Sequence, residues 1–105
     1  MKIYIAGKIT GMEEEAERLF QQAEDRLTEM GYEVVNPMKL PHDHDKQWLS
    51  YMIECLTALK ECDAIFMLPN WMDSAGAGIE FTCAIRSKII FLFSYSEAKI
   101  LTENA

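Results

Sequence analysis

Positive charge is scarce in this chain. Its 10 Lys and Arg residues face 17 Asp and Glu residues, which gives a formal net charge of −7 at pH 7. A protein that binds a nucleic-acid backbone needs a face rich in Lys and Arg. We therefore expect no nucleic acid polymer as a partner, whereas a small phosphorylated ligand needs only a few local donors and stays open.

Long hydrophobic runs and paired cysteines are also missing. No apolar stretch approaches the roughly 20 residues of a membrane helix, and Met1 and Lys2 lead directly into an expected strand with no signal peptide. The cysteines, Cys55, Cys62 and Cys83, are an odd set without metal-type spacing. We expect a cytoplasmic protein with no membrane partner and with buried, reduced thiols.

The 105 residues alternate between apolar runs and helical patterns. Their length predicts a single domain over residues 1–105. Strands are expected at residues 2–6, 32–35, 63–68 and 88–93. Helices are expected from a Thr10–Glu13 capping box to Met30, at residues 48–62 after Asp45 as N-cap, at residues 81–86, and in a short C-terminal segment capped by Ser96.

This alternation predicts an α/β fold, a flavodoxin-like or Rossmann-like three-layer sandwich. Right-handed crossovers favour a four-stranded parallel sheet of order 2-1-3-4. Strands one and three are then neighbours, so the loops after Ala6 and Leu68 meet. Tyr4, Gly7, Ser74 and Glu80 are expected to converge on one cleft there.

Small residues dominate positions 73–80, Asp-Ser-Ala-Gly-Ala-Gly-Ile-Glu, between an expected strand and an expected helix. Ligands of open α/β sheets bind at the carboxyl ends of strands, and the N–H groups at a helix start favour an anion. A tight backbone turn with a solvated Glu80 explains the same residues equally well. If Glu80 is functional, a carboxylate oriented by a Tyr hydroxyl suits attack on an anomeric carbon, as in retaining glycosidases.

Other motifs carry weaker signals. The loop at residues 7–11, Gly-Lys-Ile-Thr-Gly, lacks the Walker spacing, and no GxGxxG is present, so no ATP or dinucleotide cofactor is expected. Residues 42–45, His-Asp-His-Asp, could bind a metal, but adjacent side chains rarely point the same way. We expect a solvated loop and no metal, with His44 near the ligand. Trp71 suits base stacking or a dimer contact equally.

Three segments together resemble the nucleoside 2-deoxyribosyltransferase superfamily. They are residues 4–11 (YIAGKITG), 62–69 (CDAIFMLP) and 74–80 (SAGAGIE). The resemblance covers residues 1–93 and is closest to a branch of small proteins, similar to deoxynucleoside 5′-monophosphate N-glycosidases. It implies a flavodoxin-like fold and either deoxyribosyl transfer between bases or hydrolysis of an N-glycosidic bond, with a small nucleoside or nucleotide as partner and no cofactor.

The resemblance also implies roles for individual residues. Glu80 matches the nucleophile that attacks C1′, and Tyr4 matches the tyrosine that orients it. Ser74 matches a position that helps to hold the 5′-phosphate. The remaining substrate-binding residues that we expect are Gly7, Lys8 and Ile9 in the first loop, Gly76 and Gly78 at the helix start, Trp71 and His44.

One departure from the family pattern leaves an alternative open. The family usually has an Asp in the second helix that protonates the base, whereas here Cys55 falls at that position with Glu54 beside it. A thiol is a poor proton donor to a purine nitrogen. The alternative to an enzyme is therefore a nucleotide-binding module without turnover, such as a sensor or a protein that sequesters a nucleotide signal.

Two expectations concern partners. The acidic first helix leaves a third hypothesis, an interaction protein that uses the scaffold alone. The small core and the apolar residues Trp48, Trp71 and Phe93 predict a homodimer or larger oligomer.

Overall fold

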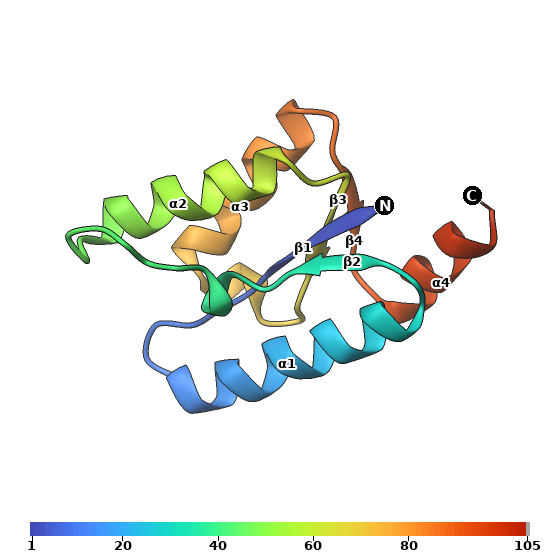
Figure 1. The fold of residues 1–105 in the computed structure, drawn as a ribbon, viewed down its shortest axis with the longest axis horizontal. Coiled ribbons are helices and arrows are strands. Elements are labelled where there is room, and N and C mark those ends of the chain that lie inside the picture. The colour runs from blue at the N-terminus through green and yellow to red at the C-terminus, as the bar shows by residue number, and fades with distance from the viewer. Residues whose placement is uncertain (105) are drawn as a thin grey trace.

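A parallel sheet lies between two layers of helices (Figure 1). The structure is a computed structural model and describes residues 1–104. Its strands are ordered β2-β1-β3-β4, which confirms the predicted α/β fold and the order 2-1-3-4. In chain order the elements are β1 (Lys2–Ala6), α1 (Glu13–Glu29), β2 (Glu33–Val35), η1 (Pro37–Lys39), α2 (Trp48–Lys60), β3 (Ala64–Met67), η2 (Trp71–Asp73), α3 (Ala75–Arg86), β4 (Ile90–Leu92) and α4 (Tyr95–Glu103).

The central strand β1 divides the core into two halves. Successive side chains of a strand point to opposite faces. Ile3 and Ile5 pack among residues of α1 and α4, whereas Tyr4 and Ala6 pack among residues of α2 and α3. Because helices cover both faces, the strand is buried on both sides from Ile3 to Ala6. This alternation places the Tyr4 side chain on the side of the sheet that α3 covers.

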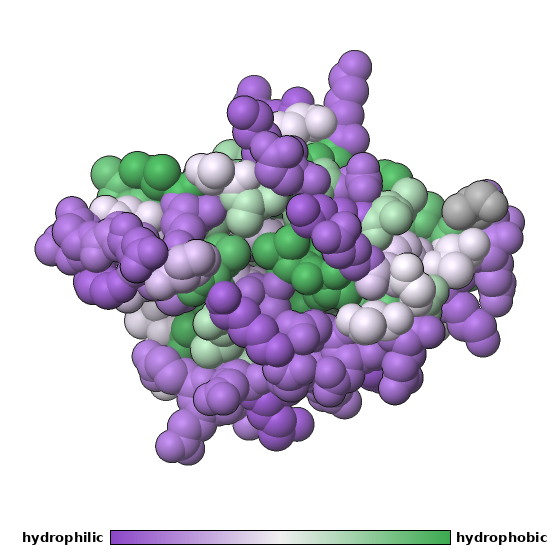
Figure 2. All heavy atoms as spheres, viewed as in Figure 1, coloured by the Kyte–Doolittle hydropathy of each residue, from purple (hydrophilic) through white to green (hydrophobic). Residues whose placement is uncertain are grey.

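The first helix is amphipathic, as its sequence predicts. Its buried residues are Ala16, Phe20, Ala23 and Leu27, and hydrophilic side chains cover its outer face (Figure 2). Burying a side chain such as Phe20, which is 0% exposed, stabilises the fold by roughly 1.5–3 kcal/mol. Gly31, with φ +97°, follows the helix as its C′ residue.

The starts of α1 and α2 differ from the sequence prediction. Thr10 does not cap α1; the chain turns at Gly11, whose φ is +85°, and Met12 is an N-cap without a side-chain bond. Likewise, Asp45 is not the N-cap of α2, because Lys46 has φ +66° and delays the helix. Asp45 instead accepts a hydrogen bond from the backbone N–H of Gln47, which is the N-cap.

The last two helices also begin earlier than expected. Ser74 is the N-cap of α3, so Gly76 and Gly78 lie inside the helix rather than before it. Ser94, not Ser96, caps α4 by accepting a hydrogen bond from the N–H of Glu97 at 3.1 Å. The reason is the spacing Ser94-x-x-Glu97, which resembles a capping box. The Glu97 carboxylate accepts in return from the N–H of Phe93 at 2.8 Å.

The loops after β1 and β3 meet, as the strand order predicts. The N–H of Leu68 donates to the carbonyl of Ala6 at 2.8 Å, and the N–H of Lys8 donates to Oδ1 of Asn70 at 3.1 Å. A Cβ on Gly7 would lie only 2.7 Å from Cδ1 of Leu68. Glycine at position 7 therefore permits the close approach of the two loops.

The cysteines are free, and only Cys62 is buried, whereas Cys55 and Cys83 are half-buried. The expectation of buried thiols thus holds for one of them. Within residues 1–104, no helix combines the length and the apolar character that crossing a membrane requires.

Candidate functional site

A pocket of about 720 Å³ opens where the loops after β1 and β3 meet. The structure brings seven of the sequence-predicted site residues to its wall: Tyr4, Gly7, Lys8, Ile9, Ser74, Gly76 and Glu80. Trp71, Gly78 and His44 are not among the residues that line it. The first group comes from β1, its following loop and the start of α3, the elements that the strand order makes neighbours.

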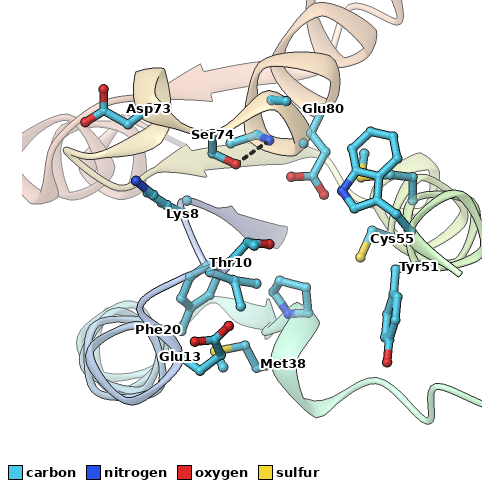
Figure 3. A pocket seen from close by; sticks show the side chains of 18 of the residues that line it. Lys8, Thr10, Glu13, Phe20, Met38, Tyr51, Cys55, Asp73, Ser74 and Glu80 are labelled. Atoms are coloured by element: carbon cyan, nitrogen blue, oxygen red, sulfur yellow. Dashed lines mark hydrogen bonds between the residues drawn. The ribbon is translucent and has the colours of Figure 1, made fainter. Parts of the chain in front are cut away.

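Glu80 and Tyr4 form a buried pair at the base of this pocket. Glu80 is only 6% exposed and lies on the face of α3 that also buries Ala77 and Ala84. The hydroxyl of Tyr4, which is 0% exposed, donates a hydrogen bond to Oε2 of Glu80. Figure 3 shows the Glu80 carboxylate pointing from α3 into the pocket. Glu80 thus places a carboxylate on a helix face whose other buried residues are alanines.

Burial shifts the protonation of both groups. It raises the pKa of Glu80 from 4.5 to about 7, although the hydrogen bond from Tyr4 opposes this rise. Burial, followed by the negative charge of Glu80, raises the pKa of Tyr4 well above 10.0. Tyr4 is therefore a permanent hydrogen-bond donor at neutral pH, while Glu80 exchanges its proton near neutrality. Such shifts are typical of functional carboxylates.

The start of α3 forms a second part of the pocket wall. Oγ of Ser74 accepts a hydrogen bond from the N–H of Ala77 at 3.1 Å, and the N–H of Gly78 donates to the Ser74 carbonyl at 3.0 Å. The N–H groups of Ala75 and Gly76 precede the first helical donors, and both residues line the pocket. These two amides, not that of Gly78, are available to an anion at the positive end of the helix dipole.

The wall opposite Ser74 comes from α2, and the sequence did not identify it. Trp48, Tyr51 and Cys55 line the pocket, and Figure 3 shows Tyr51 and Cys55 across from Lys8 and Ser74. Their spacing of three and four residues is that of one helix face, which was the available signal. The sequence also predicts an apolar stripe on α2, formed by Leu49, Met52, Ile53, Leu56 and Leu59. This prediction was partly wrong, because Leu49 is 64% exposed and Ile53 is 58% exposed.

Neither Cys55 nor Glu54 is suited to donate a proton to a ligand in the pocket. Burial raises the pKa of the Cys55 thiol to about 11, and the charges of Glu80 and Glu54 add to the rise. Glu54 is absent from the pocket wall and accepts hydrogen bonds from the N–H and the ring of His42. Burial alone would raise the pKa of Glu54, but these bonds and the nearby histidines bring it below its ordinary value.

The two histidines of the predicted solvated loop converge on Glu54. Nδ1 of His42 lies 2.5 Å, and Nε2 of His44 lies 3.4 Å, from the same oxygen of Glu54. His42 and His44 are half-buried, whereas Asp43 between them is exposed. The positive φ of His42, +55°, turns the loop toward α2, and for this reason the expectation of a solvated loop was wrong.

Trp71 lies outside the pocket in a group of aromatic rings. Its ring centroid is 4.8 Å from that of Phe81 and 6.2 Å from that of Phe93. The indole thus packs against these rings and does not line the pocket beside Glu80.

Comparisons with known proteins identify the family and the fold. The family model described as "Domain of unknown function (DUF4406)" matches residues 1–92. Among solved structures, the chain is similar to a 2-deoxyribosyltransferase from the psychrotolerant bacterium Bacillus psychrosaccharolyticus. The TM-score is 0.60 and the sequence identity 17%, with 94% of this chain and 90% of that chain covered. The comparison confirms the shared fold that the sequence resemblance implied. No curated protein matches the chain.

Proposed function

The chain belongs to the DUF4406 family, and from its pocket we propose that it cleaves the N-glycosidic bond of a small nucleoside 5′-monophosphate or transfers its deoxyribosyl group. The observation that carries this proposal is the buried Glu80 carboxyl group, which receives a hydrogen bond from Tyr4 at the base of an open pocket. The likeness of the fold to a 2-deoxyribosyltransferase supports the same reaction class.

In the proposed reaction, ionised Glu80 is the nucleophile. Its carboxylate oxygen attacks C1′ of the sugar as the bond from C1′ to the base nitrogen breaks, and the electron pair of that bond leaves with the base. The base takes up one proton from solvent water, and the water or second base that attacks later loses one. Water, or a second base in a transferase, then attacks C1′ of the glycosyl ester and releases Glu80. Tyr4 orients the carboxylate throughout, since its own proton stays in place at neutral pH.

The two walls of the pocket suit the two ends of a nucleotide. Ser74, the amides of Ala75 and Gly76, and Lys8 provide donors for a 5′-phosphate. Tyr51 and Trp48 on the opposite wall provide aromatic faces for a base. Glu80 points into the space between these walls (Figure 3), where the sugar of such a ligand would lie.

The direct test compares the wild type with Glu80→Ala. We expect chromatography to detect free base when the wild type is incubated with a panel of ribo- and deoxyribonucleoside 5′-monophosphates. The variant should release none but should still bind the same nucleotide in calorimetry. Equal base release by both proteins would overturn the role of Glu80.

A binding module without turnover is the second candidate, and Cys55 favours it. The thiol stands beside Glu80 in the pocket, and its pKa of about 11 makes it a weak acid. Tight binding of a nucleotide by the wild type, with no base released after long incubation, would support this module. Prompt release of base would eliminate it.

A further inference from the structure

We propose that His42, His44 and Glu54 bind a divalent metal ion of the zinc type at the edge of the pocket. One ligand atom from each residue lies within 4.8 Å of the other two. Two imidazole nitrogens and one carboxylate oxygen are a donor set that suits zinc, as in sites with two His and one Glu. The site is separate from Glu80 and does not depend on the proposed glycosidic chemistry.

The distances among the ligand atoms are close to those that a metal requires. Bonds of about 2.0–2.1 Å in tetrahedral geometry place neighbouring ligand atoms about 3.3 Å apart. Nε2 of His44 already lies 3.4 Å from Oε1 of Glu54, while Nδ1 of His42 lies 2.5 Å from it. A bound ion therefore requires that His42 and Glu54 separate by roughly 1 Å, while the two histidine nitrogens, which lie within 4.8 Å of each other, adjust to a similar spacing.

The His44 side chain shows an unmet bonding capacity. Among residues 1–104, its Nε2 is the buried side-chain nitrogen or oxygen that has no hydrogen-bond partner. Buried polar atoms in native proteins are nearly always paired, so such an atom calls for a ligand. The nitrogen faces Glu54 at the centre of the cluster, where a metal ion would complete its bonding.

Packing holds the two imidazole rings in place. The ring of Tyr51 meets both edge-on, with centroid separations of 5.1 Å to His42 and 4.4 Å to His44. Tyr51 and Glu54 both project from α2, so the helix fixes one ligand and the ring support together. The cluster is therefore built on a regular element, which is what a metal site of defined geometry needs.

Metal binding would break two hydrogen bonds. The bond between Nδ1 of His42 and Oε1 of Glu54 is lost because both atoms become metal ligands. The second bond lies at His44. The N–H of Lys46 donates to Nδ1 of His44 at 3.1 Å, which places the ring proton of neutral His44 on Nε2. Coordination through Nε2 requires the proton to move to Nδ1, so the Lys46 bond must break. This bond is exposed, and water can replace both partners. The Lys46 amide is thus a local reporter of binding at His44.

Three protein ligands leave the coordination shell open. His42 and Tyr51 line the pocket, so the site borders the space that a ligand would enter. Zinc sites with three protein ligands keep a position for water or a ligand atom. We infer that this position accepts water or an oxygen or nitrogen donor of a pocket ligand.

Titration of the full chain with zinc chloride, without nucleotide, tests the site. We expect one zinc ion per chain in calorimetry and after dialysis, a higher melting temperature, and a shift of the Lys46 amide resonance. His44→Ala and Glu54→Gln should each weaken binding more than about 100-fold, because loss of even an outer-shell partner costs 10–100-fold. Asp43→Asn, which changes an exposed carboxylate of the same loop, should bind like the wild type.

Substitution with cobalt distinguishes the ligands. The visible spectrum of the Co²⁺ protein should show tetrahedral bands without thiolate charge transfer, and Cys55→Ser should leave it unchanged. Absence of saturable zinc binding, or equal binding by His44→Ala, would overturn the proposal. A third result would also overturn it: His44→Ala lowers the melting temperature without metal, while zinc does not change the melting temperature of the wild type. The cluster would then be a structural ion pair. None of these outcomes bears on base release by Glu80.

Discussion

The Glu80 carboxyl group should make the folded chain less stable as the pH rises from 4.5 through about 7. Its pKa is about 7 in the folded chain and 4.5 as the reference value, so the folded state binds this proton more tightly. The resulting stabilisation is fully present below pH 4.5 and is lost as the pH rises through about 7. The loss is on the order of 3 kcal/mol, because one pKa unit corresponds to 1.36 kcal/mol.

Urea unfolding of the wild type and Glu80→Gln at several pH values measures this effect. The glutamine retains the shape and can accept the Tyr4 hydrogen bond, but it does not titrate. The variant should therefore gain stability relative to the wild type between pH 4.5 and 7, the range of the raised pKa. A constant difference across this range would show that burial leaves the Glu80 pKa at its ordinary value.

Tyr4→Phe should move the Glu80 pKa upward while preserving the packing of the ring. The Tyr4 hydrogen bond is the influence that lowers this pKa against burial. A hydrogen bond to a charged group contributes roughly 1.5–3 kcal/mol, which corresponds to about one to two pKa units. The Glu80 carboxyl ¹³C resonance should titrate at a higher pH, and the pH dependence of base release should shift equally.

Tyr32→Phe is the matched control for Tyr4→Phe. It also removes a buried hydroxyl, which donates to the carbonyl of Ala98 at 2.7 Å on the opposite face of the sheet. It should lower the melting temperature without moving the Glu80 titration. If both variants shift the titration alike, Tyr4 does not act through its hydrogen bond to Glu80.

At the scale of the elements, Gly7 in the loop after β1 and Gly78 inside α3 should respond differently to substitution by alanine. A Cβ at Gly7 would meet Leu68 Cδ1 at 2.7 Å, whereas a Cβ at Gly78 would meet nothing within 4 Å. Gly7→Ala should destabilise the chain by about 1–3 kcal/mol through overpacking. Gly78→Ala should stabilise it by roughly 0.5–1 kcal/mol, since Gly78 lies inside α3.

Denaturant unfolding of the two alanine variants checks this contrast. Nucleotide binding adds a second readout, because the Gly78 N–H is already bonded to Ser74 and the residue is absent from the pocket wall. Gly78→Ala should thus bind nucleotide as the wild type does. Weaker nucleotide binding by this variant would show that Gly78 contributes to the binding site, as the sequence resemblance suggested.

The sequence revealed the half of the pocket that belongs to β1 and α3. The apolar run of β1 and the small residues before Glu80 determine both elements locally, and the strand order then makes them neighbours. The wall from α2 was missed, because α2 carries apolar residues on more than one side. Sequence alone does not show that Trp48, Tyr51 and Cys55 line the pocket while Leu49 and Ile53 do not.

The histidine cluster was hidden for a different reason. His42 and Lys46 have φ values of +55° and +66°, a conformation that glycine usually signals and these residues do not. The loop therefore bends back toward α2, and no pattern in the sequence predicts this bend. Contacts of His42 and His44 with Glu54 are tertiary, and no local spacing predicts them.

At the scale of the whole molecule, we predict that the chain self-associates through the edge of the sheet at β4. Phe91 is 47% exposed, Ile90 40% and Phe93 39%, and β4 pairs with β3 alone. An unpaired edge strand is a template for association, and exposed apolar patches commonly mark interfaces. The group of Trp71, Phe81, Phe91 and Phe93 would supply the aromatic centre of the contact.

Light scattering at micromolar concentration should give at least twice the chain mass of 12.1 kDa. Phe91→Arg should shift the population toward the monomer, because it places a charge in the expected contact. The pair Leu49→Gln and Ile53→Gln is the control, since these residues are also exposed but lie on α2. A wild type of only 12.1 kDa would contradict self-association, and dissociation by the α2 variants alone would move the interface from β4 to α2.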